Sequence, residues 1–530
     1  MLKSLSFKNL SCSNLALGLL LTLLLGSSGL ALLALTGWQT APEVQLWQDL
    51  WFWRVLKFTL WQALLSSFIS VLLALPLARA LVMDARLPAK AAFLRWCLLC
   101  FVMPSLILIT GLVVMFGFSG WLTPFLNLVF GDGWSLYGLT GILLAHVFLN
   151  LPLAIRVLTS QWDSIPSSVW KMAAQLHLTG WQRFLLVEWP ALRSVLPALL
   201  GFIFLLCFNS FAVVLALGGG PAATTLEVAI FQALKYNFNP SEALFLAVTQ
   251  LLVAGSCFWL FSRWGKLEWL APASAGQTWR PQTNRLTLWL GRFFYLFIAL
   301  YLTLPVLGLL PTAVSKGLAG LPWLKLFKAS GWSLLFALTA SLLAVFMALQ
   351  LSWVSSNQQQ KNGLTRLVPV AALHHLIIPG MVLSVGLYIF FMPLINWMDW
   401  GWLAIIWLNT LIALPFAFSQ LKPAVFSYQA NYQRLAASLG LPFGVYWWRV
   451  VLPYLKPALQ RVAAISLVLT LGDFAIFGIF GQPEYTTLPW LIYELAGSYQ
   501  LAAAALASLW LLGLAFIGLI LLERKSDVKC

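Results

Sequence analysis

The sequence contains one motif twice, first as Lys171-Met-Ala-Ala-Gln-Leu-His177 and again as Arg434-Leu-Ala-Ala-Ser-Leu-Gly440. The two copies stand 263 positions apart, and each is followed by a proline, Pro190 or Pro453, sixteen residues after its second alanine. Matched leucines mean little in so apolar a chain, whereas paired alanine and matched proline at one constant spacing indicate a duplication. We therefore expect a protein of two related halves.

The composition is that of a membrane protein. Of the 530 residues, 61% are hydrophobic and 9% are charged, whereas a soluble domain carries about 25% charged residues. The apolar residues form long runs, such as Leu15 to Leu35, and about 20 apolar residues in a helix cross a bilayer core. The sequence predicts an all-α integral membrane protein with about twelve transmembrane helices. The expected spans are 14–36, 55–81, 96–117, 138–159, 196–217, 243–263, 288–311, 331–354, 368–392, 402–420, 459–480 and 500–522.

Lysine and arginine residues gather in alternate segments between the apolar runs, and such segments lie in the cytoplasm. This topology accounts for the net charge of +16 without nucleic-acid binding, and it places both termini in the cytoplasm. A polar segment with two prolines separates six helices from six. The expected parts are a first half over 1–264, a cytoplasmic linker over 265–287 and a second half over 288–530. An even number of helices per half makes the halves parallel, so both motif copies lie in cytoplasmic loops.

The residue types of the motif suit a short helix that another protein contacts. Adjacent alanines allow close approach, a glycine adopts the positive φ that ends a helix, and proline is tolerated where the next helix begins. The simpler alternative is a pair of connecting loops that diverged after the duplication. The candidate docking residues are Ala173, Ala174, His177, Pro190, Ala436, Ala437, Gly440 and Pro453.

Both copies resemble the conserved cytoplasmic loop of importer-type ABC permeases, in which Glu-Ala-Ala is followed by Gly and then by Pro. The resemblance implies the type I importer fold in a bacterial inner membrane. It also implies two copies of a cytoplasmic ATP-binding subunit and a periplasmic substrate-binding protein as partners. This chain departs from the pattern because Lys171 and Arg434 replace the glutamate and His177 replaces the first glycine.

The chain has no Gly-rich phosphate-binding loop followed by Lys-Ser or Lys-Thr. Its Gly218-Gly219-Gly220 segment is not followed by either pair. We therefore expect no enzymatic activity, with ATP hydrolysis on a separate subunit. The Cys97-x-x-Cys100 pair has no second pair or histidine nearby, so no metal and no cofactor are expected.

Several further stretches resemble bacterial thiamine permeases, and the resemblance covers nearly the whole chain. They include Leu143 to Pro152, Cys207 to Glu227, and Gly472-Asp473-Phe474. The resemblance implies import of thiamine and its phosphates. Fused permeases for ferric iron have similar repeats and are the first alternative. An ion-coupled secondary carrier is the second alternative, although such carriers need ionisable groups within the membrane, which are scarce here.

Polar residues within apolar runs are candidates for the translocation pathway. Asn209 and Ser210 align with Gly472 and Asp473 at the 263-residue spacing, next to Phe211 and Phe474. If both stretches face the interface between the halves, Asn209, Ser210 and Asp473 line the pathway. The alternative is local hydrogen bonding within each helix bundle.

Overall fold

The computed structural model describes residues 4–36, 42–84, 86–131, 134–264, 279–281, 284–315, 323–356, 363–376, 378–432 and 438–523. These residues form helices joined by turns, and the predicted all-α membrane protein is confirmed. The helices of the first half are α1 (Ser4–Leu35), η1 (Val44–Gln48), α2 (Leu50–Met83), α3 (Lys90–Val102), α4 (Ser105–Phe116), α5 (Thr123–Phe130), α6 (Leu139–Asp163), α7 (Ser167–Gln175), α8 (Gly180–Arg183), η2 (Phe184–Glu188), α9 (Trp189–Arg193), α10 (Leu196–Phe208), α11 (Ala212–Leu217), η3 (Pro221–Ala223), α12 (Leu226–Lys235) and α13 (Pro240–Trp264).

The second half repeats this order of elements. Its helices are α14 (Arg285–Val314), α15 (Trp323–Ser356), α16 (Gly363–Leu373), η5 (His374–Leu376), α17 (Gly380–Phe391), α18 (Trp397–Asn431), α20 (Phe443–Tyr446), η6 (Trp447–Val451), α21 (Leu452–Leu471), α22 (Ala475–Phe480), η7 (Pro483–Tyr485), α23 (Leu488–Gly497) and α24 (Leu501–Glu523).

The twelve expected spans carry helices, but in the described residues only eight of them are unbroken helices of membrane-spanning length, or up to ten with two bent pairs counted as one span each. The third span of each half breaks at a proline. Pro104 separates α3 from α4, with a bend of 102°, and Pro379 stands at the start of α17. A proline disfavours helical geometry at the residue before it and lacks the N–H that continues a helix, which favours a break at these positions.

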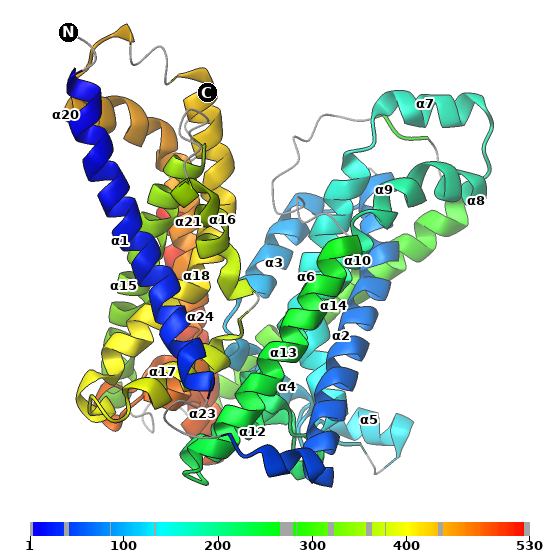
Figure 1. The fold of residues 1–530 in the computed structure, drawn as a ribbon. Coiled ribbons are helices and arrows are strands. Elements are labelled where there is room, and N and C mark those ends of the chain that lie inside the picture. Colours follow the sequence, from blue (N-terminus) through cyan, green and yellow to red (C-terminus); the bar gives the residue numbers. More distant parts are fainter. Residues whose placement is uncertain are drawn as a thin grey trace.

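The first helix of each half packs against the other half. α1 lies along α17 and α16, while α14 lies along α4, α2 and α3 of the first half and also along α24 of its own half (Figure 1). Both contacts depend on a glycine. A Cβ on Gly111 of α4 would stand 2.5 Å from the Pro305 carbonyl oxygen, and one on Gly386 of α17 would stand 2.5 Å from that of Ala31. Only glycine allows the backbones to approach this closely.

Polar contacts also join α1 and α14, which we call the exchanged helices, to the opposite half. Arg292 of α14 donates to Asp84 at 2.8 Å, and Tyr301 donates to the Leu144 carbonyl at 2.6 Å. On the other side Ser28 of α1 lies 2.8 Å from Nε2 of His374. Burial raises the pKa of Asp84, but hydrogen bonds from Arg292 and the Arg86 N–H, with both positive charges, bring that pKa below its ordinary value.

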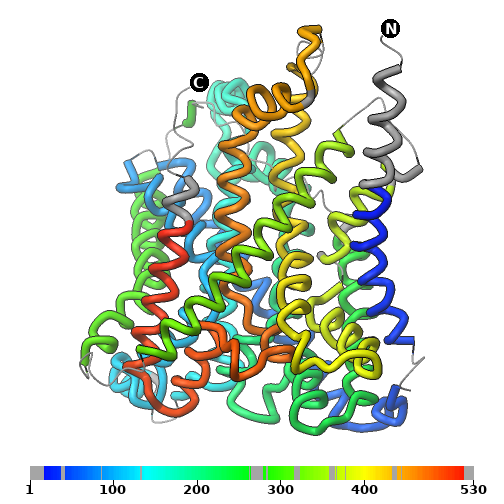
Figure 2. Tube along the Cα trace, turned by 90° about the vertical axis from the view of Figure 1, so that its left-hand side faces the viewer, coloured from blue at the N-terminus to red at the C-terminus, as the bar shows by residue number. Residues whose placement is uncertain are grey.

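The two ends of the molecule differ in architecture. At one end α7 and α20 project beyond the long helices (Figures 1 and 2), and Figure 1 shows the two groups of helices diverging at this end. At the opposite end the short helices α12 and α23 bring the halves together (Figure 1). We refer to these as the α7 end and the α12 end.

Candidate functional site

The first motif copy forms the helix α7. Trp170 is fully buried and Ala173 is 3% exposed, whereas Ala174 is half-buried. The guanidinium of Arg280, from the polar segment between the halves, lies 5.1 Å from the Trp170 ring and donates to Asp163 at 2.9 Å. One face of α7 is thus held against the rest of the protein.

The other face of this loop is apolar and exposed. Met172 is 55% exposed, Leu176 is 64% exposed and Trp181, in α8, is 69% exposed. We call these three side chains the docking face. Large exposed apolar side chains that gather on one projecting loop are typical of a protein–protein contact.

His177 adopts the conformation expected of a glycine. Its φ is +49°, and Gly440 at the equivalent position has φ of +58°. The His177 N–H donates to the Ala174 carbonyl and the Leu178 N–H donates to the Ala173 carbonyl, which is the Schellman pattern that ends a helix. His177 therefore holds the same left-handed conformation as Gly440, although the histidine costs about 1 kcal/mol relative to glycine.

A buried glutamate fixes the first loop to the helix bundle, and sequence reasoning missed it. Glu188 is fully buried. Its carboxylate accepts two hydrogen bonds from Arg79 of α2, at 2.6 and 2.9 Å, and one from the Trp162 indole at 3.1 Å. Arg183 lies 3.7 Å away; burial lowers its pKa and the charge of Glu188 opposes that change. We call these four residues the ion cluster.

The second motif copy is described only in part. Ala436 and Ala437 lie outside the described residues, while Gly440 and Pro453 lie within them. Each loop returns to the membrane through one π-helical turn, η2 in the first half and η6 in the second. Pro190 and Pro453 stand in the first turn of the α-helices that follow, as expected from their missing N–H.

Apolar side chains replace the ion cluster in the second half. Val451 stands at the position of Glu188, and it packs with Tyr428, Leu455 and Trp353. The rings of Trp353 and Trp447 lie 4.8 Å apart. We call this group the aromatic cluster.

The helices that follow the loops break at equivalent places. α10 ends at Phe208 and α11 begins at Ala212, while α21 ends at Leu471 and α22 begins at Ala475. We call residues 209–211 and 472–474 the central breaks. Interrupted helices in transporters mark substrate sites, because their free backbone groups must line a cavity or find partners.

The two central breaks meet through their phenylalanines. The rings of Phe211 and Phe474 stack with centroids 5.5 Å apart. Since these residues are equivalent in the repeat, their contact lies on the pseudo-twofold axis between the halves. Phe231 packs edge-on against Phe211, and Tyr493 packs in the same way against Phe474.

The predicted pathway residues lie in these breaks, and two of them have hydrogen bonds within their own half. The side-chain Oδ1 of Asn209 accepts a hydrogen bond from the Gln250 amide at 3.2 Å. Asp473 accepts from the Asn409 amide at 3.1 Å and from the N–H groups of Ile476 and Phe477. Ser210 lies between Asn209 and Phe211, at the position equivalent to Asp473. The breaks therefore place polar groups beside the Phe211–Phe474 contact.

Known proteins resemble this chain over almost its full length. No family model matches it. The thiamine transport system permease protein ThiP of Salmonella typhimurium is 36% identical over 500 residues, covering 92% of each chain. The ThiP protein of Escherichia coli strain K12 is 36% identical over 516 residues, covering 95% of each. A ferric transport system permease protein of Actinobacillus pleuropneumoniae is 30% identical over 160 residues, which cover 29% of this chain.

Proposed function

The chain belongs to the family of bacterial thiamine transport system permeases, and we propose that it carries thiamine and thiamine phosphates across the inner membrane as the permease of an ATP-driven importer. The observation that carries this assignment is 36% identity over 95% of both chains. The ferric-iron alternative has a match over only 29% of this chain, and the ion-coupled carrier leaves the duplicated loop without a role.

We propose that two ATP-binding subunits contact the α7 end, one at each loop. The docking face supports this assignment, since Met172, Leu176 and Trp181 expose apolar surface beside an anchored helix. Ala174 and its equivalent Ala437 allow close approach of the partner. ATP hydrolysis then takes place on those subunits, and this chain transmits their movement to the membrane helices.

The α7 end is cytoplasmic in this proposal, and so are both termini. The division into two halves over 1–264 and 288–530, joined by a linker over 265–287, gives each ATP-binding subunit one equivalent loop. The α12 end then faces the periplasm, where the substrate-binding protein delivers its ligand.

The pathway runs between the central breaks. Phe211 and Phe474 close it on the axis, and separation of the halves at the α12 end parts these rings. Asn209, Ser210 and Asp473 then offer polar contacts to a substrate that has left water. A site of this kind is formed by interrupted helices at the interface between repeats.

Uptake measurements test the substrate. The permease is produced with its ATP-binding subunit and binding protein in a bacterial strain that lacks its own thiamine permease. We expect uptake of labelled thiamine that depends on ATP. Uptake of ferric iron without uptake of thiamine contradicts the proposal.

Charged substitutions test the docking role. We expect the double variant Ala174→Glu, Ala437→Glu to hydrolyse ATP without transporting thiamine, because a carboxylate at a close contact separates the subunits. Ser194→Glu, exposed in the same region but outside α7 and α8, is the matched control. Normal coupled transport by the double variant rejects the docking role.

A further inference from the structure

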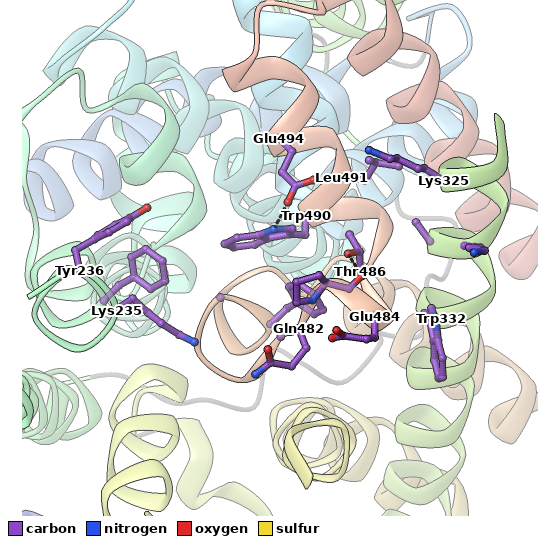
Figure 3. A pocket seen from close by; sticks show the side chains of 17 residues that line it. Lys235, Tyr236, Lys325, Trp332, Gln482, Glu484, Thr486, Trp490, Leu491 and Glu494 are labelled. Atoms are coloured by element: carbon purple, nitrogen blue, oxygen red, sulfur yellow. Dashed lines mark hydrogen bonds between the residues drawn. The ribbon is translucent and has the colours of Figure 1, made fainter. Parts of the chain in front are cut away.

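A cavity of about 600 Å³ opens at the α12 end between the two halves. Its walls come from α12 of the first half and from α15, α22 and α23 of the second half, as Figure 3 shows. Pockets that hold small molecules range over about 300–1,000 Å³, so the space suits one compound with a few rings. None of the pathway candidates lines it.

Aromatic side chains line the cavity. Trp332 of α15 and Trp490 of α23 are half-buried there, with Phe231, Tyr236 and Phe477 nearby. Figure 3 shows the Trp490 ring between the α12 wall and the Trp332 wall. Aromatic faces of this kind stack on heteroaromatic rings and attract cationic ones.

Three ammonium groups also line the cavity without carboxylate partners. Lys235 comes from α12 and Lys325 from α15 on the opposite side (Figure 3), and Lys328 of α15 also lines the cavity. Within the described residues no acidic side chain lies within 4.0 Å of any of the three. Burial lowers the pKa of Lys235, as expected for a half-buried ammonium that lacks a counter-ion. An anion held between the walls would contact both halves at once.

Two carboxylates complete the lining. Glu494 accepts a hydrogen bond from the Trp490 indole at 2.8 Å, and Glu484 of η7 also lines the cavity (Figure 3). The cavity therefore combines flat aromatic surfaces, free positive charge and a smaller amount of negative charge. This combination is complementary to a compound that carries a cationic heteroaromatic ring and a phosphate ester on one short chain.

We propose that this cavity is an outer binding site for the phosphorylated form of the substrate, with Trp332 and Trp490 against its rings and Lys235, Lys325 and Lys328 at its phosphate. The proposal depends on the thiamine function proposed above. It adds the site at which the permease distinguishes the phosphate ester from free thiamine. Trp490 also stacks on Phe474, with ring centroids 5.2 Å apart, so Trp490 links the cavity to the central break of the second half.

The test compares uptake of labelled thiamine monophosphate and labelled thiamine by the complete transporter. In the double variant Lys325→Gln, Lys328→Gln we expect uptake of the ester to fall about tenfold more than uptake of thiamine, because hydrogen bonds to charged groups contribute most to such recognition. Trp332→Leu removes a surface that both compounds use, so it should lower both uptakes by a similar factor. Lys57→Gln, exposed in α2 and outside the cavity, is the matched control and should change neither.

Each outcome decides between alternatives. If the lysine variant loses both uptakes equally while its amount in the membrane is normal, the lysines contact the binding protein and the proposal is wrong. Unchanged uptake of both compounds also overturns it. If the unmodified permease transports neither compound, the thiamine function itself fails, which is distinguishable from failure of the cavity. Basal ATP hydrolysis of the variants confirms that they are folded and assembled.

Discussion

The two motif loops share the left-handed residue at His177 and Gly440 and the π-helical turn that follows, but opposite kinds of contact hold them to the helix bundle. In the first half the ion cluster joins the loop to α2 through Arg79 and Glu188. In the second half the aromatic cluster joins the loop to α15 through Trp353 and Val451. Trp353 follows Arg79 by 274 positions, the same spacing that separates Thr59 from Ser333, and these two hydroxyls accept equivalent hydrogen bonds from Leu226 and Leu488.

This difference teaches that a duplicated scaffold conserves geometry more strictly than chemistry. A buried ion cluster is stable only when every member is present, since a missing partner leaves an uncompensated charge. An apolar cluster loses free energy gradually as atoms are removed. The two loops should therefore respond very differently to single substitutions.

The largest expected effect is that of Glu188→Ala. Arg79 and Arg183 would then share a buried site with no carboxylate, which costs about 3–5 kcal/mol of unfolding free energy. We expect a clearly lower thermal unfolding temperature for the purified permease in detergent. Val451→Ala at the equivalent position removes two methyl groups and should cost about 2 kcal/mol. Equal losses at the two positions would show that the ion cluster adds nothing beyond packing.

The helices α1 and α14 allow the opposite test, because each half has a glycine where it receives the first helix of the other half. Gly111→Ala and Gly386→Ala each place a methyl group 2.5 Å from a carbonyl oxygen of the incoming helix. Overpacking of this kind costs about 1–3 kcal/mol, and the two losses should agree. Gly26→Ala in α1 has open space around its new Cβ and should not lower the unfolding temperature, because alanine favours a helix more than glycine does. A marked difference between the first two variants would mean that only one exchange stabilises the protein.

The repeat in the sequence predicted much of this arrangement, and physical reasons explain the features that it did not predict. Constant spacing identifies equivalent residues, so it placed Phe211 opposite Phe474 in the alignment before their contact was known. Hydropathy counts apolar residues but does not locate helix ends, so the breaks at Pro104 and Pro379 and the exchange of α1 and α14 were not predicted. The Arg79–Glu188 pair joins residues 109 positions apart, and no local pattern connects them.

Pathway residues were predicted by polarity alone, which gives position but not partners. Asn409 lies 64 positions from Asp473, and Gln250 lies 41 from Asn209. Each amide stands in an apolar run where a polar group needs a partner, and that signal could have suggested the pairs. The docking role of Ala436 and Ala437 in the second loop stays a prediction, because both residues lie outside the described residues.

The central breaks allow a further comparison of the two halves, with an expected loss of stability smaller than those above. Asp473→Ser gives the second break the residue of the first and removes a carboxylate that accepts from two backbone N–H groups. Serine caps backbone N–H groups about as well as aspartate, so we expect a loss of about 1 kcal/mol, mainly from the hydrogen bond that Asn409 donates. The reciprocal Ser210→Asp should do more harm, since His146 and not an amide occupies the position of Asn409 there. Thermal unfolding gives both costs, and thiamine uptake shows whether the Asp473 charge serves transport; a harmless Ser210→Asp would mean that the breaks are interchangeable.

The smallest expected effect concerns the ends of the two motif helices. His177 holds φ of +49° and Gly440 holds φ of +58°, so exchanging the two residue types isolates the cost of a side chain in the left-handed region. His177→Gly should raise stability by about 1 kcal/mol, and Gly440→His should lower it by a similar amount. Unfolding temperatures of the two single variants and of the double variant, which should nearly equal the unmodified protein, measure this directly. If His177→Gly instead lowers stability or coupled transport, the imidazole contributes a contact of its own, and the asymmetry of the two loops extends to their tips.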